Sequence, residues 1–314
     1  MSSTSRSSTV MLTWAAVGIA ITAVVAFTGG YFVGTMVTEA PKGFTIVDDY
    51  GRTVEIDGVP ERIVSVAPTP TEILFAIGAG PQVVGVDNYS DYPEEARDLP
   101  QVGDFELNNE VIIALNPDLI IAGDLVPRAQ LEQLAADGIP YVLFADRTLE
   151  DVFKTIRLAG IITGHVEEAD NLATSLSERV EAVTDKTLDP NVTKPKVFVE
   201  YYAFGSSIWT FGPGSFGDDL IELAGGTNIA HNTSSEYPIV ESEFVMAQNP
   251  DVIVYAATST TKADIIAREG WGNITAVTDD KIYSIDDNLI SRYGPRIVDG
   301  LEQLTAMIHP ELFS

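Results

Sequence analysis

Aromatic side chains follow several of the expected strands. Tyr89 and Tyr92 come directly after the strand pattern VVGVD, and Tyr202 follows KVFVEY. Ligands of open α/β sheets bind beyond the carboxyl ends of the strands. These rings therefore indicate a broad apolar surface that could stack on a large, flat ligand, although ordinary packing is the simpler explanation for any single ring. Other aromatic residues stand in or beside expected loops: Phe105, Phe204, Trp209, Phe211 and Tyr237.

Positive charge is scarce in this chain. It has 18 Lys and Arg against 46 Asp and Glu, a formal net charge of −28. Such a charge repels phosphate backbones and excludes nucleic-acid binding. The acidic excess serves either ordinary solubility or life at high salt. Arg292 and Arg296 follow a predicted strand–helix junction, where they either contact a ligand or form ion pairs on a helix surface.

Motifs for catalysis and for metal binding are missing. There is no Cys, no G-x-S-x-G and no H-E-x-x-H, and the three His residues are scattered. The segment Gly212–Gly217 matches G-x-G-x-x-G, but it lies in the second half of the chain, outside an opening βαβ unit. We expect it to form a tight turn and the start of a helix that lines the cleft.

The N-terminus predicts a membrane anchor. Residues 10–37 form an uncharged segment that is long enough to cross a bilayer, and Arg6 precedes this segment. We expect a cytoplasmic tail over 1–9, a transmembrane anchor over 10–37 and a folded body outside the cytoplasm. A cleaved signal peptide is the alternative. Four N-x-S/T sequons weakly support export: Asn88, Asn191, Asn232 and Asn273.

The folded body alternates strand and helix patterns, which predicts an α/β fold with parallel sheets covered on both faces. We expect a tether and short hairpin over 38–60, an N-terminal αβ lobe over 61–148 and a C-terminal αβ lobe over 188–314. Residues 149–187 carry apolar positions at helical spacing without Pro. They predict one long helix that joins the lobes, with the ligand cleft between them.

The two lobes repeat one design. The segment EVIIALNPDLIIA from Glu110 aligns with EFVMAQNPDVIVYA from Glu243, and TEILFAIGAG resembles DDLIELAGG upstream. Each repeat predicts a short helix that ends before Pro and a strand that follows it. Glu110 and Glu243 therefore occupy equivalent helix starts, where the helix dipole favours a carboxylate. Their symmetry also suits two basic sockets on a two-fold partner.

These residues carry a resemblance to a known family. The segments RIVSVAPTPTEILFAIGAG, both Asn-Pro-Asp units, AGGTNI and YGPRIVDGLEQL resemble the class III substrate-binding proteins of ABC importers. The resemblance implies two αβ lobes on a rigid helix, no enzymatic activity and no resident cofactor or metal. It implies as partners a permease dimer with its ATPase subunits. It also implies that Glu110 and Glu243 are docking carboxylates for permease arginines.

Within the family, VGVDNYSDYP and LPQVGDF resemble the cobalamin-binding members most. That likeness implies ligand contacts at Tyr89, Phe105, Trp209, Tyr237, Asn288 and Arg292. Phe105 and Tyr237 stand where those members have Trp, and Asn288 stands where they have Asp. A ferric siderophore or haem is therefore the alternative ligand. An exported hydrolase, or an extracellular sensor or adhesion module, is the alternative outside transport.

Overall fold

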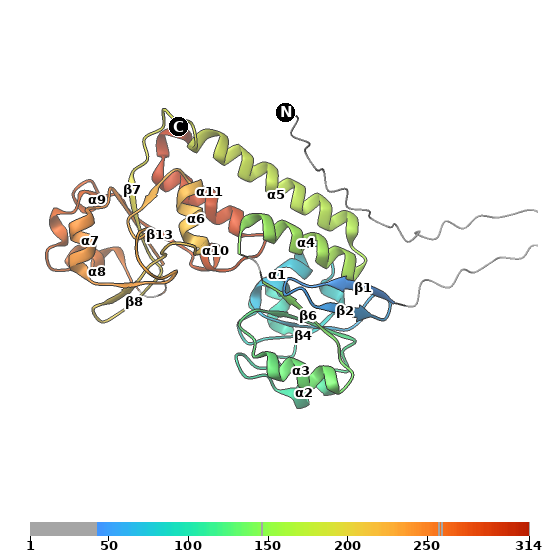
Figure 1. Ribbon diagram of the computed structural model, residues 1–314. Coiled ribbons are helices and arrows are strands. Elements are labelled where there is room, and N and C mark those ends of the chain that lie inside the picture. The colour runs from blue at the N-terminus through green and yellow to red at the C-terminus, as the bar shows by residue number, and fades with distance from the viewer. Residues whose placement is uncertain (1–42, 146, 257, 259, 314) are drawn as a thin grey trace, which may run out of the picture.

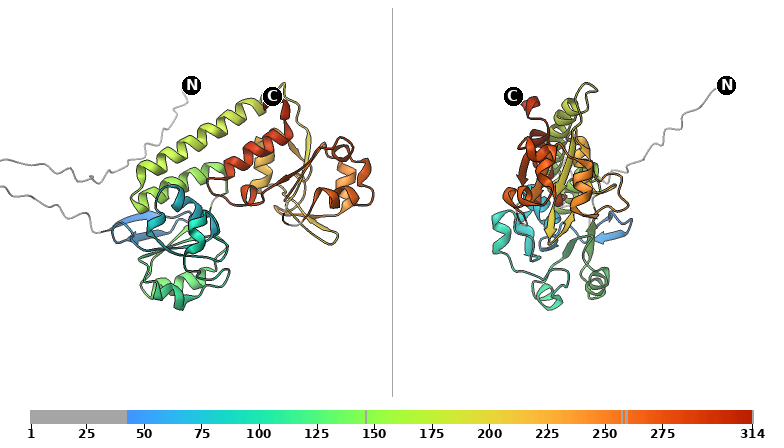
Figure 2. Two further views of the ribbon diagram at one scale, coloured as in Figure 1. Left: turned by 180° about the vertical axis from the view of Figure 1, so that it is seen from behind. Right: turned by 90° about the vertical axis from the view of Figure 1, so that its left-hand side faces the viewer.

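The computed structural model describes residues 43–145, 147–256, 258 and 260–313 (Figure 1). The predicted tail, anchor and first part of the tether lie outside these residues. Within the part of the chain that is described, no helix is long and apolar enough to cross a membrane. The body has two αβ lobes beneath a pair of helices, and Figure 2 shows the same arrangement from behind and from the side.

The N-terminal lobe is a parallel sheet with helices on its faces. Its strands are all parallel, as the alternating pattern predicts, and they run in the order β4-β3-β5-β6. The strands are β3 (Ile63–Val66), β4 (Val83–Val86), β5 (Leu119–Gly123) and β6 (Tyr141–Phe144). The helices are α1 (Pro68–Ala76), α2 (Asn109–Ala114) and α3 (Arg128–Ala136), and the predicted hairpin is β1 (Phe44–Val47) with β2 (Thr53–Ile56).

The C-terminal lobe repeats the parallel sheet and adds a small antiparallel one. The parallel order is β10-β7-β12-β13, with β7 (Lys196–Glu200), β10 (Thr227–Asn228), β12 (Val252–Ala256) and β13 (Ile282–Ile285). The antiparallel sheet is β11-β9-β8, with β8 (Tyr202–Phe204), β9 (Ser207–Trp209) and β11 (Ile239–Val240). The helices are α6 (Phe216–Leu223), α7 (Ser242–Gln248), α8 (Lys262–Ala267), α9 (Thr275–Thr278), α10 (Asn288–Ser291) and α11 (Ile297–Ile308).

The connection between the lobes differs from the expected single helix over 149–187. The structure has two helices, α4 (Leu149–Thr163) and α5 (Val166–Thr187), that pack against each other. Gly164 ends α4 in the left-handed conformation, with φ of 79°, and this geometry reverses the chain because Gly carries no penalty there. With 22 residues, α5 is about 33 Å long and runs from one lobe to the other (Figure 1).

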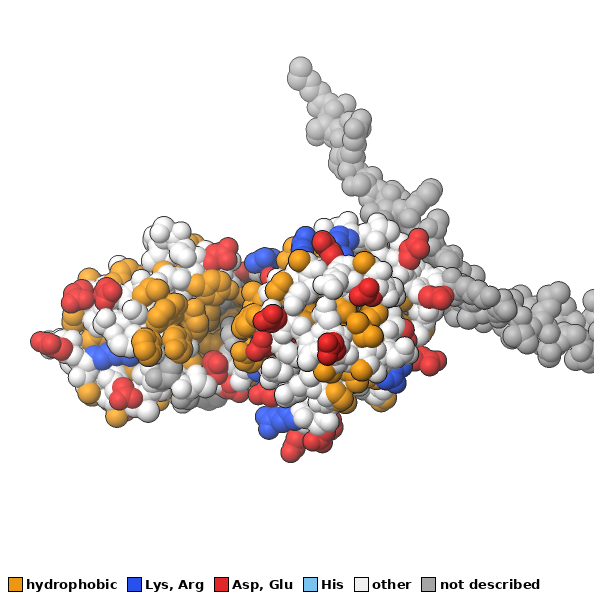
Figure 3. Space-filling view, turned by 90° about the horizontal axis from the view of Figure 1, so that it is seen from below, with side chains coloured by type: hydrophobic (Ala, Val, Ile, Leu, Met, Phe, Trp, Pro, Cys, Tyr) orange, Lys and Arg blue, Asp and Glu red, His pale blue; other side chains and the backbone are white. Residues whose placement is uncertain are grey.

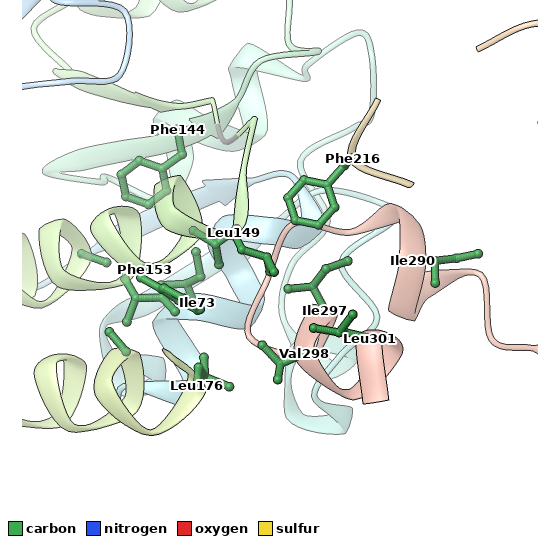
Figure 4. Close-up of a cluster of buried hydrophobic side chains, with 14 of the residues drawn as sticks. Ile73, Phe144, Leu149, Phe153, Leu176, Phe216, Ile290, Ile297, Val298 and Leu301 are labelled. Carbon is green, nitrogen blue, oxygen red and sulfur yellow. The ribbon is translucent and has the colours of Figure 1, made fainter. Parts of the chain in front are cut away.

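One hydrophobic core extends through both lobes and the connecting helices. Figure 4 shows its centre, where side chains of α1, α4, α5, α6 and α11 meet. Because interiors are close-packed, separating the lobes would have to open this core. We therefore expect small lobe motions. The labelled members are Ile73, Phe144, Leu149, Phe153, Leu176, Phe216, Ile290, Ile297, Val298 and Leu301.

The repeated Asn-Pro-Asp units have the same local structure in each lobe. Asn116 and Asn249 adopt left-handed φ values of 48° and 49° just after α2 and α7. Asp118 then accepts the backbone N–H of Arg62, and Asp251 accepts that of Lys196. Each basic side chain in turn donates to a carbonyl at the end of its helix, Arg62 to Leu115 and Lys196 to Gln248. The motif thus ties each short helix to the start of a central strand.

Candidate ligand-binding cleft

The two lobes border a common hollow. Seen from below, hydrophobic side chains gather on the C-terminal lobe beside this hollow (Figure 3). A cavity of about 200 Å³ lies between the lobes; it is lined by Pro68, Leu125 and Phe144 on one side and by Arg292 and Tyr293 on the other. The predicted cleft between the lobes is therefore present.

Tyr89 and Phe105 form the apolar surface of the N-terminal lobe. Their ring centroids are 5.8 Å apart, and the rings are 50% and 58% exposed. With Pro68, Leu125 and Val126 they line a second cavity of about 230 Å³. Its lining residues follow β3, β4 and β5, at the carboxyl ends of parallel strands, where ligand sites of such sheets form.

A buried polar chain supports the Tyr89 loop. The hydroxyls of Ser65, Thr71 and Ser90 are linked at 2.8 Å each, and Ser90 donates to the Asp87 carboxylate. Asp87 also accepts the Tyr89 N–H at 3.2 Å, and burial raises the pKa of its carboxyl. Sequence reasoning missed this support, although an Asp at the end of VVGVD and the hydroxyls of PTPTE were visible signals.

The small antiparallel sheet provides the aromatic and apolar surface of the C-terminal lobe. Trp209 on the central strand β9 pairs in register with Tyr202 and with Ile239, so the three side chains share one face of the sheet. The Tyr202 and Trp209 ring centroids are 5.2 Å apart. Tyr202 and Ile239 are exposed. Phe204, two residues beyond Tyr202, extends the same face and is 74% exposed. We refer to these four residues as the β8–β9–β11 face.

Tyr237 lies beside this face and is held by other aromatic rings. Its hydroxyl is 3.0 Å from that of Tyr293, and its ring makes edge contacts with Tyr201 and Phe211. Tyr293 stacks on Phe216, and burial raises the pKa of its phenol. The polar hydroxyl of Tyr237 thus lies near the cleft, and the Tyr237 ring packs on other aromatic rings. These contacts fix the position of the ring without a ligand.

Arg292 and Arg296 reach across to the N-terminal lobe. Arg296 donates twice to Glu72, at 2.9 and 2.6 Å, and Arg292 donates to Asp91 at 2.7 Å and to Glu72 at 3.3 Å. Arg292 also donates to the Tyr89 carbonyl at 3.3 Å. We call Glu72, Asp91, Arg292 and Arg296 the interlobe ion-pair cluster. Both guanidinium groups line or adjoin the cleft, but their charges are matched.

Asn288, Glu110 and Glu243 line neither of the two cavities, and the same is true of Trp209 and Tyr237. The Asn288 amide donates to Asp286 at 2.9 Å at the start of α10. Glu110 and Glu243 are both exposed, each the second residue of its helix, α2 and α7. Their structural equivalence matches the repeat. Nothing in the contacts assigns a role to these three side chains, so their roles stay predictions.

The glycine-rich segment forms a turn and a helix start. Ser215 accepts the N–H of Asp218 and begins α6, as expected for an N-cap. Gly217 packs so closely on the Phe211 ring that any Cβ would overlap it. The third glycine is therefore required by packing against Phe211, a buried aromatic residue of the core. Among the described residues, no group of three His, Asp or Glu side chains could hold a metal ion.

Comparison with known proteins places this architecture. The family model of periplasmic binding proteins matches residues 63–289. An uncharacterized ABC transporter substrate-binding lipoprotein of Bacillus subtilis, YvrC, is 32% identical over 275 residues, which are 86% of this chain and 86% of that protein. A vitamin B12-binding protein of Pectobacterium carotovorum is 30% identical over 253 residues, 80% of this chain and 89% of that one.

A solved structure supports the same assignment. The periplasmic heme-binding protein RhuT from Roseiflexus, in its apo form, superimposes with a TM-score of 0.72 and 29% identity, over 80% of this chain and 98% of that chain. The relatives thus share one architecture and differ in the ligands that their names state. On the family match over most of the folded body, this chain belongs to the periplasmic binding protein family and is a substrate-binding protein of an ABC importer.

Proposed function

We propose that this protein captures a corrinoid, cobalamin, outside the cytoplasm and delivers it to an ABC permease without chemical change. The observation that carries the proposal is the exposed aromatic pair Tyr89 and Phe105, which lines a cavity of the N-terminal lobe. We propose that Trp209 and Tyr237 supply the matching surface of the C-terminal lobe, because Trp209 lies on the β8–β9–β11 face and the Tyr237 hydroxyl contacts that of Tyr293 in the interlobe cavity. Aromatic surfaces of this kind suit a large macrocycle, which they bury by stacking and apolar contact.

The charge of the cleft favours a neutral macrocycle. Arg292 and Arg296 are matched by Glu72 and Asp91, and Arg147 lies 3.5 Å from Asp124. An anionic ferric siderophore, or the propionates of haem, would gain most from an unmatched cation. Cobalamin instead carries neutral amides on its rim. Asn288 is the proposed polar contact to that rim, and Arg292 borders it.

The alternative is a ferric siderophore or haem, as in an iron-uptake importer. The exposed phenol of Tyr89 is the feature that favours haem, because a tyrosine can ligate haem iron. Under this alternative the iron complex would sit in the same cleft. The assignment to an ABC importer would stand, and only the cargo would change.

Delivery requires docking to a permease dimer with its ATPase subunits. We propose Glu110 and Glu243 as the docking carboxylates, one on each lobe, because both are exposed at equivalent helix starts. We also propose that residues 10–37 anchor the protein in the membrane. A Glu110→Ala, Glu243→Ala double variant should bind ligand normally and fail to support uptake. Normal uptake by this variant would contradict the docking role.

Calorimetric titration of residues 40–314 tests the cargo directly. We would titrate cyanocobalamin, haemin and a ferric hydroxamate in parallel, in low and high salt. Saturable one-to-one binding of cyanocobalamin alone is the expected result. Binding of haemin or the hydroxamate alone, by a folded sample, would replace cobalamin with an iron complex.

A further inference from the structure

The interlobe ion-pair cluster contains two carboxylates and two guanidinium groups, and a third guanidinium group, that of the exposed Arg97, lies 3.9 Å from Asp91 at the outer edge of the cluster. Glu72 is almost fully buried, with 2% of its side chain exposed, and the side chains of Arg292 and Arg296 are 15% and 17% exposed. Asp91 is the open member, with 49% exposed. The Arg296 guanidinium is further covered by the Tyr92 ring, 3.8 Å from its centroid. Asp91 is therefore the carboxylate that solvent, or a ligand, can reach.

Asp91 also controls whether Arg292 presents a free charge. Burial alone would raise the pKa of the Asp91 carboxyl, but the hydrogen bond and the charge of Arg292 hold it below its ordinary value, so Asp91 is ionised at neutral pH. Glu72 is already shared between both guanidinium groups. Without the Asp91 charge, Arg292 and Arg296 would keep one carboxylate in direct ion-pair contact, Glu72, beside the cavity that Arg292 lines.

The same arginine sets the position of the Tyr89 loop. Arg292 donates to the carbonyl of Tyr89 and to the side chain of Asp91, two residues later, while Asp87 accepts the Tyr89 N–H from within the N-terminal lobe. The loop is thus held from both lobes. An Asn at position 91 keeps a side-chain oxygen for Arg292 and removes the charge, so charge and position can be separated.

We propose that Asp91 is a specificity-determining residue that neutralises Arg292 and so excludes anionic ligands from the cleft. The inference rests on the proposed function, because it concerns the ligand of the same site. It assigns Arg292 a positioning role for Tyr89 in place of a charged contact to the ligand. It also accounts for an arginine at the cleft of a protein whose proposed cargo is neutral.

The test compares each neutral ligand with an anionic form of the same macrocycle. Cyanocobalamin is paired with its monocarboxylate, in which one rim amide is hydrolysed, and haemin is paired with its dimethyl ester. The ratio of the dissociation constants of the neutral and the anionic member is measured for the parent and for Asp91→Asn. We expect Asp91→Asn to shift this ratio by about tenfold toward the anionic member, a change of about 1.4 kcal/mol.

Two further variants make the result specific. Asp98→Asn removes the same charge from an exposed position in the same segment and should leave the ratio unchanged. Asp91→Asn combined with Arg292→Gln removes the freed cation and should return the ratio to that of the parent. Because Asp91 is half exposed, Asp91→Asn should unfold cooperatively like the parent, as circular dichroism would check.

The outcomes distinguish this inference from the proposed function. An unchanged ratio in Asp91→Asn, with the parent still binding one of the pairs, would overturn the role of Asp91 and leave the transport role intact. An equal shift in Asp98→Asn would overturn it as well, because the effect would then be one of overall charge. Failure of the parent to bind any of the four compounds would overturn the macrocycle proposal and, with it, this inference.

Discussion

The two lobes share a scaffold and differ in the surfaces that they offer to a ligand. In both, an Asn-Pro-Asp unit ties a short helix to a central parallel strand through the same backbone contacts. The N-terminal lobe then presents Tyr89 and Phe105 on loops after its strands, whereas the C-terminal lobe presents Trp209 and Tyr202 on an added antiparallel sheet.

The supports of the two surfaces differ accordingly. The Tyr89 loop depends on Asp87 beneath it and on Arg292 from the other lobe. The β8–β9–β11 face depends on its own strand pairing and on nothing from the N-terminal lobe in the contacts described. A duplicated scaffold can therefore be kept for stability, while each copy acquires its ligand surface separately. A substitution that alters the contacts between the lobes should therefore move the Tyr89 loop and leave the β8–β9–β11 face in place.

The largest expected effect is on the free energy of unfolding, when either of two buried carboxylates is replaced. Glu72 pairs across the lobes, and Glu200 pairs with Arg268 within the C-terminal lobe. Leaving buried guanidinium groups unmatched costs about 3–5 kcal/mol, so Glu72→Gln and Glu200→Gln should each lower the free energy of unfolding by about 3 kcal/mol. Only Glu72→Gln should split the urea transition, followed by circular dichroism, into two steps.

The exposed Glu95→Gln serves as the control and should change the stability by less than about 0.5 kcal/mol. Equal, single transitions for Glu72→Gln and Glu200→Gln would contradict the account, because the cluster would then not couple the lobes.

The next largest effect is the loss of ligand affinity when either aromatic surface is truncated. Trp209→Ala should weaken cyanocobalamin binding by about 2 kcal/mol, or roughly thirtyfold, and Tyr89→Ala by somewhat less, because Trp has the larger ring. Trp209→Phe should recover most of the loss. Calorimetry measures both, with Tyr50→Ala, an aromatic residue in the β1–β2 turn, as a control. If either surface could be truncated without loss, the ligand would contact one lobe only.

The repeated aspartates test whether the shared scaffold is equally important in both lobes. Asp118 accepts the N–H groups of Glu61 and Arg62, and Asp251 accepts that of Lys196. Hydrogen bonds of this kind contribute about 1 kcal/mol each when partly exposed. Thermal unfolding should therefore show a larger loss for Asp118→Ala than for Asp251→Ala. The reverse order would contradict this account, in which the number of accepted hydrogen bonds sets the loss of stability.

The smallest effect concerns pH and is confined to the C-terminal lobe. The hydrogen bond to Asp218 raises the pKa of His231 above its usual value, with a smaller contribution from Glu222. The protonated form is favoured in the folded state, so its stabilisation is present below pH 6.5 and is lost as the pH rises through the folded pKa. Stability of His231→Gln should match the parent at pH 9 and fall below it at pH 5. A constant difference across this range would contradict the assignment.

Much of the fold could be predicted from the sequence, because apolar periods and Gly and Pro positions mark each element. The alternation of RIVSVA, a helix and VVGVD predicted parallel strands, and the repeated Asn-Pro-Asp units predicted equivalent helices. The sequence indicated at most a bend at Gly160 or Gly164, whereas the structure reverses the chain, because Gly164 adopts a left-handed φ and His165 starts a new helix.

The site was less accessible to sequence reasoning. Tyr89 and Phe105 could be placed at the carboxyl ends of the parallel strands, where they line a cavity. The partners of Arg292 could not, because Glu72 and Asp91 lie about two hundred residues away in the chain and are joined to it only by the meeting of the lobes. The hydroxyl chain of Ser65, Thr71 and Ser90 was hidden for the same reason.

The central claim is that both lobes contact one neutral macrocycle. A crystal structure of residues 40–314 with cyanocobalamin would test this claim most directly. The account predicts the corrin ring between Tyr89 with Phe105 and Trp209 with Tyr237, with the Arg292 guanidinium still on Asp91. A corrin ring bound away from this cleft, or Arg292 turned from Asp91 onto the ligand, would contradict it.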